Sequence, residues 1–249
     1  MCRLFGMLSP EPVTTRFWLL DATDSVLEQS LRNPDGTGLA HYVGSDPVVD
    51  KQPIAAYEDR ELAAEARHVH SHLFVAHVRH ATRGEPRLEN TQPFSHGSLV
   101  FAHNGDIEGL EELPGSSGLL LGDTDSERYF VLLQHNIREA PDAITGIRKT
   151  VDWVKENCTY VSLNFLLADG DSLYALRLPD TNGLFVRRLE AEEDLRGSSS
   201  YGTRTESRHR SGAILFASER IDSAPSWRDL EPGTLAVARR DLRLEMYRV

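Results

Sequence analysis

Residues 1–9 of the chain read MCRLFGMLS, a short and largely apolar run that is typical of a buried β-strand. Cys2 stands directly behind the initiator methionine, and the only other cysteine among the 249 residues is Cys158. Cys2 is therefore either an ordinary strand or surface residue or, once Met1 is removed, the first residue of the mature chain. In the second case a thiol and a free α-amino group belong to the same residue.

Eight further apolar runs, bounded by turn residues, predict strands along the rest of the chain. They cover residues 37–43, 72–80, 98–105, 161–169, 172–179, 183–190, 213–218 and 234–240. Helical spacing of apolar residues predicts helices over 124–140 and 142–157, and a weaker pattern covers 20–31. Hairpin-linked strands with few helices predict an α+β fold of antiparallel sheets in a single domain over residues 2–249.

The bulk composition is that of a globular protein, with 40% hydrophobic and 26% charged residues. A net charge of −11 argues against nucleic acid as a partner, because phosphate binding needs a cationic face. No apolar run reaches the roughly 20 residues that cross a bilayer, and the first 20 residues do not resemble a signal peptide. We therefore expect a cytoplasmic protein without a membrane partner. The locally basic stretch 204–210 is expected to be a solvated surface loop.

Charged residues that could hold a ligand occur in two places. Arg79 and Thr82 follow the predicted strand 72–80, and an arginine there could bind a carboxylate through two parallel hydrogen bonds or form an ordinary surface ion pair. Asp123 and Asp125 stand at the start of the predicted helix 124–140. They either stabilise the positive end of the helix dipole or bind a ligand ammonium group.

Asn104 and Gly105 follow the predicted strand 98–105 and form a dipeptide that is typical of tight turns. A turn is the simple interpretation. The alternative is that the side-chain amide and the glycine N–H point the same way, as two donors for an oxyanion.

Three histidines, His68, His70 and His72, alternate along the chain, so a strand would place them on one face. No carboxylate or cysteine cluster with metal-ligand spacing accompanies them, and no phosphate-binding glycine loop is present. We therefore expect neither a metal nor another cofactor. Cys158 is expected to be a buried, unreactive thiol.

Taken together and in chain order, these stretches resemble the glutaminase domain of class II glutamine amidotransferases, which are N-terminal-nucleophile hydrolases. The resembling segments span nearly the whole chain: CRLFG (2–6), DGTG (35–38), HVRHATRGEPRLENTQPF (77–94), FAHNGDI (101–107), GDTDSE (122–127), and FASERID (216–222) with Trp227. The likeness is greatest to stand-alone members, such as the γ-glutamyl hydrolase of ergothioneine synthesis and a glutathione-degrading amidase subunit. It implies a four-layer αββα sandwich of two antiparallel sheets.

The resemblance also implies a role for each candidate residue. Met1 would be removed, and Cys2 would become the nucleophile with its own α-amino group as the base. The ordinary pKa values suit this role, because a thiol near 8.5 and an α-amine near 7.7–8.0 exchange a proton close to neutrality. The other implied roles are α-carboxylate binding by Arg79, assistance by the Thr82 hydroxyl, α-ammonium binding by Asp125, and an oxyanion hole made by Asn104 and Gly105.

Two positions depart from the well-known synthetases, where a tryptophan follows the arginine and a histidine follows the threonine. This chain has His80 and Arg83 there, so the identity of the group attached to the γ-glutamyl carbonyl stays open. We expect a stand-alone amidohydrolase that cleaves a small γ-glutamyl amide through a thioester on Cys2. The alternatives are an ammonia-supplying partner of a separate synthetase or amidase subunit, and a non-catalytic binding protein. Association into a homo-oligomer also stays open.

Overall fold

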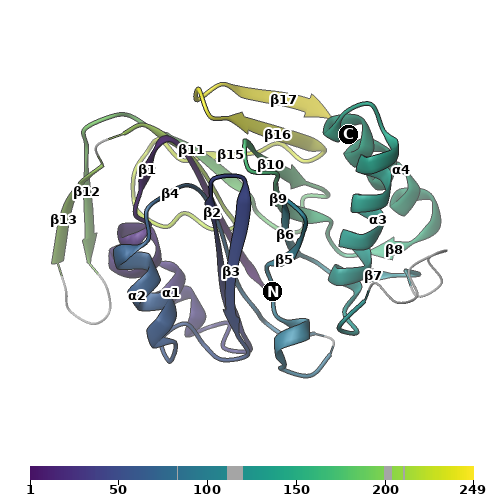
Figure 1. Cartoon of the computed structure of the whole chain (residues 1–249), viewed down its shortest axis with the longest axis horizontal. Helices are drawn as coiled ribbons and strands as arrows, with labels where there is room; N and C mark the ends of the chain where they lie inside the picture. Colours follow the sequence, from purple (N-terminus) through teal and green to yellow (C-terminus); the bar gives the residue numbers. More distant parts are fainter. Residues whose placement is uncertain (83, 111–119, 199–203, 210) are drawn as a thin grey trace.

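The computed structural model describes residues 1–82, 84–110, 120–198, 204–209 and 211–249. Two antiparallel sheets form its centre (Figure 1). Within these ranges the first sheet has the strand order β15-β11-β14-β1-β4-β2-β3. Its strands are β15 Arg228–Asp229, β11 Phe185–Leu189, β14 Ala213–Ala217, β1 Arg3–Val13, β4 Ser71–Val78, β2 Thr37–Val43 and β3 Asp46–Gln52.

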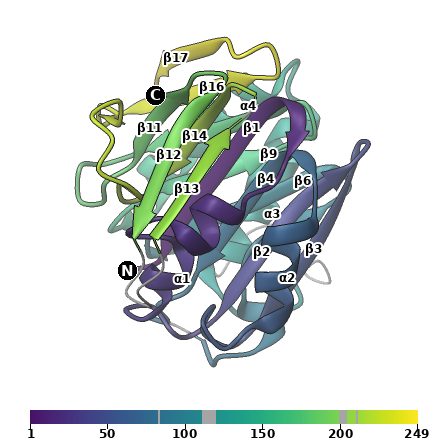
Figure 2. The ribbon, with the colours of Figure 1, turned by 90° about the vertical axis from the view of Figure 1, so that its left-hand side faces the viewer.

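The second sheet has the order β17-β16-β10-β9-β6-β5. Its strands are β17 Leu244–Arg248, β16 Thr234–Arg239, β10 Ser172–Arg177, β9 Asn164–Ala168, β6 Leu99–Asn104 and β5 Phe94–His96. Two short ribbons pair β12 Glu193–Ser198 with β13 Arg204–His209, and β7 Ile107–Glu108 with β8 Thr159–Tyr160. The first of these ribbons lies outside the first sheet (Figure 2).

Helical segments cover the outer faces of both sheets, as Figure 1 shows. The π-helical turn η1 Phe17–Asp21, α1 Val26–Ser30 and α2 Arg60–His68 pack on the first sheet. The helices α3 Asp125–Glu139 and α4 Ala143–Asn157 pack on the second, and a 3₁₀ turn, η2 Leu88–Asn90, precedes β5. The predicted α+β fold, an αββα sandwich of two antiparallel sheets, is confirmed.

The apolar layer between the two sheets explains why the strands are apolar on both faces. In β1, Phe5 and Met7 join the cluster under α1 and α2, whereas Leu4 and Leu8 join the cluster between the sheets. Strands buried on both sides lose the usual alternation of apolar and polar residues. The two sheets approach each other closely at Gly6, because a Cβ atom there would stand 2.9 Å from Leu166 Cδ1 of the opposite sheet.

All nine predicted strands are present, and α3 and α4 occupy the two strongly predicted helical stretches. The weaker pattern over 20–31 contains a regular α-helix only over Val26–Ser30. Residues 204–209 form β13 and not the expected loop, because antiparallel pairing with β12 satisfies their main-chain groups whatever the side-chain charge. Arg210 of that stretch lies outside the described residues. In the described part of the chain, no helix is long and apolar enough to span a membrane.

Gly6→Val should destabilise the sandwich, because the added isopropyl group must displace the leucines of the facing sheet. Overpacking of a dense core typically costs about 1–3 kcal/mol. Urea unfolding followed by circular dichroism would measure the loss. Val43→Thr, at an exposed position on β2, is the control and should change stability by less than about 0.5 kcal/mol. Equal stability of the two variants would contradict the close approach at Gly6.

Candidate active site

Strand alternation brings the predicted residues to one end of the gap between the sheets. Cys2 continues the alternation of Leu4 and Leu8, and Arg79 continues that of the inter-sheet residues of β4. β1 and β4 pair with Arg3 opposite Val78, so the same register places Cys2 beside Arg79. Asn104 ends β6 on the inter-sheet side of the second sheet, and the N-terminus lies between the sheets in Figure 1.

The thiol of Cys2 lies against the main chain of His80. The His80 N–H donates to Cys2 Sγ at 3.4 Å, and Sγ lies 3.5 Å from the His80 carbonyl oxygen. Burial raises the pKa of the Cys2 thiol above its ordinary value; the His80 N–H, the N-terminal ammonium and the Arg79 guanidinium offset part of this rise, and the Asp106 carboxylate adds to it. The thiol therefore needs a nearby proton acceptor to react at neutral pH.

Arg79 is a buried cation that is held by backbone carbonyl groups. Its side chain is only 4% exposed, which excludes the interpretation of an ordinary surface ion pair. The guanidinium donates to the carbonyls of Gly84 at 3.0 Å and Glu85 at 3.1 Å. Its main-chain N–H donates to Gly36, within the DGTG stretch, at 2.8 Å. The positions of both its main chain and its guanidinium group are thus held by the protein itself.

Two acidic side chains hold the loop that follows β4, and the sequence reasoning assigned a role to neither. Asp35 Oδ2 accepts the N–H of Ala81 at 2.8 Å and lies 3.9 Å from His80 Nδ1. Thr82 Oγ1 donates to Asp106 at 2.6 Å. Asp35 and Asp106 occur inside the DGTG (35–38) and FAHNGDI (101–107) stretches, so their position beside glycine turns was the available signal.

The peptide between Asn104 and Gly105 is held in one orientation. Asn182 Nδ2 donates to the Asn104 carbonyl at 3.2 Å, and a planar trans peptide then directs the Gly105 N–H the opposite way. Only glycine fits here, because a Cβ atom at position 105 would stand 1.8 Å from the Ser162 carbonyl oxygen. The dipeptide is therefore a rigid feature at the strand end, with a main-chain N–H of defined direction.

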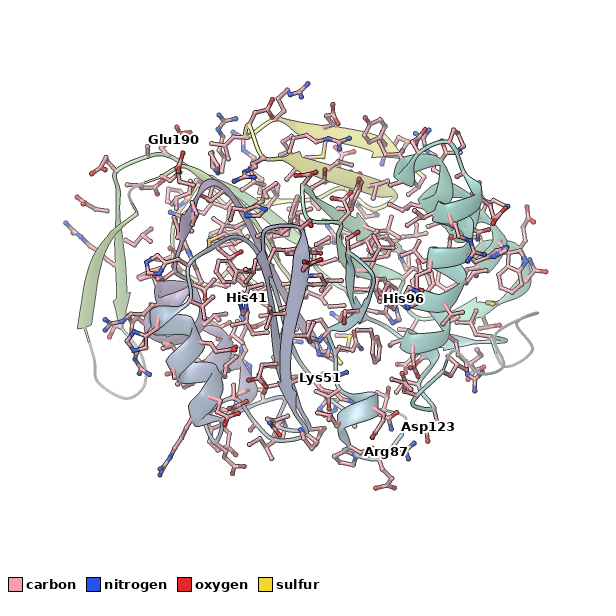
Figure 3. All side chains as sticks on the ribbon, viewed as in Figure 1. His41, Lys51, Arg87, His96, Asp123 and Glu190 are labelled. Carbon is pink, nitrogen blue, oxygen red and sulfur yellow. The ribbon has the colours of Figure 1, made fainter. Side chains whose placement is uncertain are left out.

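The two aspartates at the start of α3 have different surroundings. Asp125 is half-buried, and its Oδ2 accepts the N–H of Ile107 at 2.7 Å, close to the Asn104–Gly105 turn. Asp123 is exposed and pairs with Arg87 at 2.8 Å, at the outer edge of the molecule (Figure 3). Thr124 caps the helix by accepting the N–H of Glu127. Of the two acids, Asp125 is the one connected to the site.

The other sequence candidates lie elsewhere. His68 ends α2 while His72 lies in β4 with its Nε2 2.7 Å from the Gly170 carbonyl, so the three histidines do not share one strand. Among the residues that the structure describes, no group of three or more His, Cys, Asp or Glu side chains is placed to hold a metal ion. Cys158 directly follows α4 as its C-cap and is half-buried against the apolar cluster of α3 and α4, not fully buried as predicted.

Comparison with known proteins identifies the family of this chain. Residues 1–247 match the family described as glutamine amidotransferases, class II. The chain belongs to this family. Amide-bond hydrolysis that releases the glutamine amide nitrogen is the general chemistry of class II glutamine amidotransferases.

The relatives include proteins of similar and of greater length. An uncharacterised protein of Methanocaldococcus jannaschii is 32% identical over 71% of this chain, which spans about half (51%) of that protein. The putative glutamine amidotransferase YafJ of Escherichia coli is 28% identical over 76% of each chain. In fold, the chain resembles a predicted glutamine amidotransferase from Pseudomonas aeruginosa (TM-score 0.68, 21% identity, 100% of each chain). It also resembles the phosphoribosylpyrophosphate amidotransferase of B. subtilis (TM-score 0.68, 19% identity), covering 99% of this chain and 49% of that one.

Arg79→Gln should move the ionisation of the Cys2 thiol to higher pH, because the guanidinium charge favours the thiolate. The rate of iodoacetamide alkylation, followed from pH 6 to pH 10 in a Cys158→Ser background, reports the thiolate fraction. Arg79→Lys keeps the positive charge and is the matched control, with a smaller change expected. An unchanged profile in Arg79→Gln would show that the charge of Arg79 does not act on the thiol.

Proposed function

We propose that this class II glutamine amidotransferase hydrolyses a small γ-glutamyl amide through a γ-glutamyl thioester on Cys2. The observation that carries the proposal is the meeting of three strand ends: Cys2 before β1, Arg79 after β4, and Asn104 at the end of β6. Each supplies a different requirement of amide hydrolysis, namely a nucleophile, a fixed cation and a hydrogen-bond donor. Removal of Met1 is part of the proposal, because the base is the α-amine that this removal exposes.

The reaction divides into two acyl transfers. The Cys2 amine accepts the thiol proton, and the thiolate attacks the γ-carbonyl carbon, forming a C–S bond while the carbonyl electrons move to oxygen. The amide of Asn104 and the N–H of Gly105 stabilise that oxyanion. The C–N bond then breaks, and the amine or ammonia leaves with the proton that the Cys2 ammonium returns. Water, deprotonated by the same amine, hydrolyses the thioester and releases glutamate.

Opposite fixed charges suit the amino-acid end of a γ-glutamyl group. The buried guanidinium of Arg79 would pair with the α-carboxylate, and the carboxylate of Asp125 would pair with the α-ammonium. Burial strengthens such pairs, because little water competes for the charges. The Thr82 hydroxyl would assist at the carboxylate.

The proposed pairing of Arg79 and Asp125 with the amino-acid end of the substrate does not constrain the leaving group. The ring of His80 is half-exposed beside Asp35, at the position where the well-known synthetases carry a tryptophan. A polar ring there would accept a leaving group larger than ammonia, so γ-glutamyl amines and peptides are candidates together with glutamine.

One observation favours a partner-dependent form of the same activity. The Thr82 hydroxyl donates to Asp106 and must exchange this bond before it can serve a substrate. The binding of a separate synthetase or amidase subunit would favour this exchange. The hydrolytic activity would then rise when the two proteins associate. Robust hydrolysis by the isolated protein would instead support the stand-alone form.

Cys2→Ala should abolish turnover, whereas Cys158→Ala should leave it unchanged within about twofold. The protein, with its N-terminus verified by intact mass, is assayed with glutamine and a series of γ-glutamyl amides. Diazo-oxo-norleucine should add one label to the wild-type protein and to Cys158→Ala, but none to Cys2→Ala. No turnover on any substrate by correctly processed wild-type protein would exclude the proposed activity.

Asn104→Ala and Asp125→Asn should separate the oxyanion hole from substrate binding. Loss of one oxyanion donor typically lowers kcat by about 10²–10³, with little change in KM. Loss of the ammonium partner should instead raise KM, because the interaction is present in both ground and transition states. Steady-state kinetics on one substrate distinguishes the two. Equal effects of both variants on kcat and KM would contradict this division of roles.

A further inference from the structure

The guanidinium of Arg3 lies on the main chain of the first two residues. Its Nη1 donates to the Met1 carbonyl at 2.8 Å and to the Cys2 carbonyl at 3.1 Å. Arg3 points away from the inter-sheet gap by strand alternation, so its side chain reaches back around the end of β1 to make these bonds. Its side chain is only 15% exposed. An arginine that binds its own chain end twice restrains the position of that end.

A chain of ion pairs holds Arg3 in this position. Arg3 Nη2 lies 2.5 Å from Glu219 Oε1, and the second oxygen of Glu219 lies 3.0 Å from Arg32 Nη2. Arg32 in turn pairs with Asp24 at 2.8 Å. Glu219 follows Ser218, whose main-chain N–H and hydroxyl both bond to Leu4 of β1 at 3.0 Å. The anchor of Arg3 is thus attached to the strand that carries Cys2.

We propose that Arg3, anchored by Glu219, is a positioning residue that holds the main chain of Cys2 and keeps a positive charge beside its amino group. The inference rests on the proposed function, in which that amino group is the base. The carbonyl oxygen and amide nitrogen of one peptide are about 2.3 Å apart, so Arg3 Nη1 lies within about 5 Å of the Cys2 nitrogen. After removal of Met1, the bond to the Cys2 carbonyl remains available and the new amine faces this cation.

A cation at this distance shifts the protonation equilibrium of the Cys2 amine, the proposed base. It disfavours the protonated ammonium form, so more of the amine is neutral and able to accept the thiol proton near neutral pH. The other charged groups around Cys2 are Arg79 from β4, Asp106 after β6, Glu219 after β14, and the His80–Asp35 pair. Arg3 adds to these groups a cation that bonds directly to the main chain of Cys2.

The test compares Arg3→Gln, Arg3→Lys and Glu219→Gln, each released from a leader whose protease leaves Cys2 as the first residue. Hydrolysis of γ-glutamyl-p-nitroanilide is followed as a function of pH. Arg3→Gln should lower kcat by about 10–100-fold with KM changed less than about threefold, because misplacing a reacting group costs about this much. The acidic limb of kcat/KM should move to higher pH.

The two other variants separate charge from position. Arg3→Lys keeps the cation but cannot bond both the main chain and Glu219 through a planar fork, so kcat should fall while the acidic limb stays in place. Glu219→Gln should lower kcat less than Arg3→Gln does, since Arg3 loses its anchor but not its charge. Arg16→Gln, which breaks the exposed pair with Asp21, is the control and should match the wild type.

A direct titration keeps this inference separate from the proposed function. The ¹⁵N resonance of the Cys2 amine reports its pKa whether or not the protein turns over any substrate. A higher amine pKa in Arg3→Gln without turnover by the wild type would exclude the proposed activity and leave the role of Arg3 standing. Wild-type turnover with kcat within twofold and an unchanged amine pKa in Arg3→Gln would overturn the role of Arg3.

Discussion

The contact between the two apolar sheet faces is the constraint on which the site depends. Leu4 and Leu8 of β1 pack in this layer against strands of the second sheet, and Gly6 lets the sheets approach closely. Because side chains alternate along a strand, the residues that extend this layer at its end also face into the gap. Cys2, Arg79 and Asn104 occupy those positions. Their meeting is a geometrical result of packing two sheets with the right strands opposite each other.

The proposed nucleophile is a thiol whose pKa is raised by burial, and the groups around it are held rigidly. Burial raises the pKa of the Cys2 thiol, while the Arg79 guanidinium and the His80 N–H favour the thiolate and offset part of this rise. The Gly105 N–H, one of the two proposed oxyanion donors, is also fixed in direction, since Asn182 orients the peptide and Ser162 leaves no room for a side chain at position 105. Such preorganisation means that little rearrangement is needed when charge develops. The exception is Thr82, whose hydroxyl would have to leave Asp106 to take its proposed role at the substrate.

Much of this fold follows from local patterns in the sequence, and the reason is physical. Strands buried on both faces are short apolar runs between turns, and α3 and α4 carry apolar stripes with clear caps, so both kinds of element were predictable. Polar edge elements were not. The strand β3, DPVVDKQ, is charged, β13 is basic, and α2 buries few apolar residues. The resemblance to a family, and not periodicity, supplied the sandwich architecture and the predicted roles. Neither source revealed Asp35, Asn182 or the Arg3–Glu219 pair, because these contacts join segments far apart in the chain.

The central position of β1 in the first sheet has a consequence for the thermal stability of the site. Chain ends are usually the first parts of a protein to fray. Here the first strand pairs on both sides, with β14 and with β4, in the middle of the larger sheet. The segment that follows Cys2 is therefore held by hydrogen-bonded partners on both sides, which opposes fraying of this chain end. Under the proposed mechanism, heat inactivation should therefore coincide with the cooperative unfolding of the first sheet.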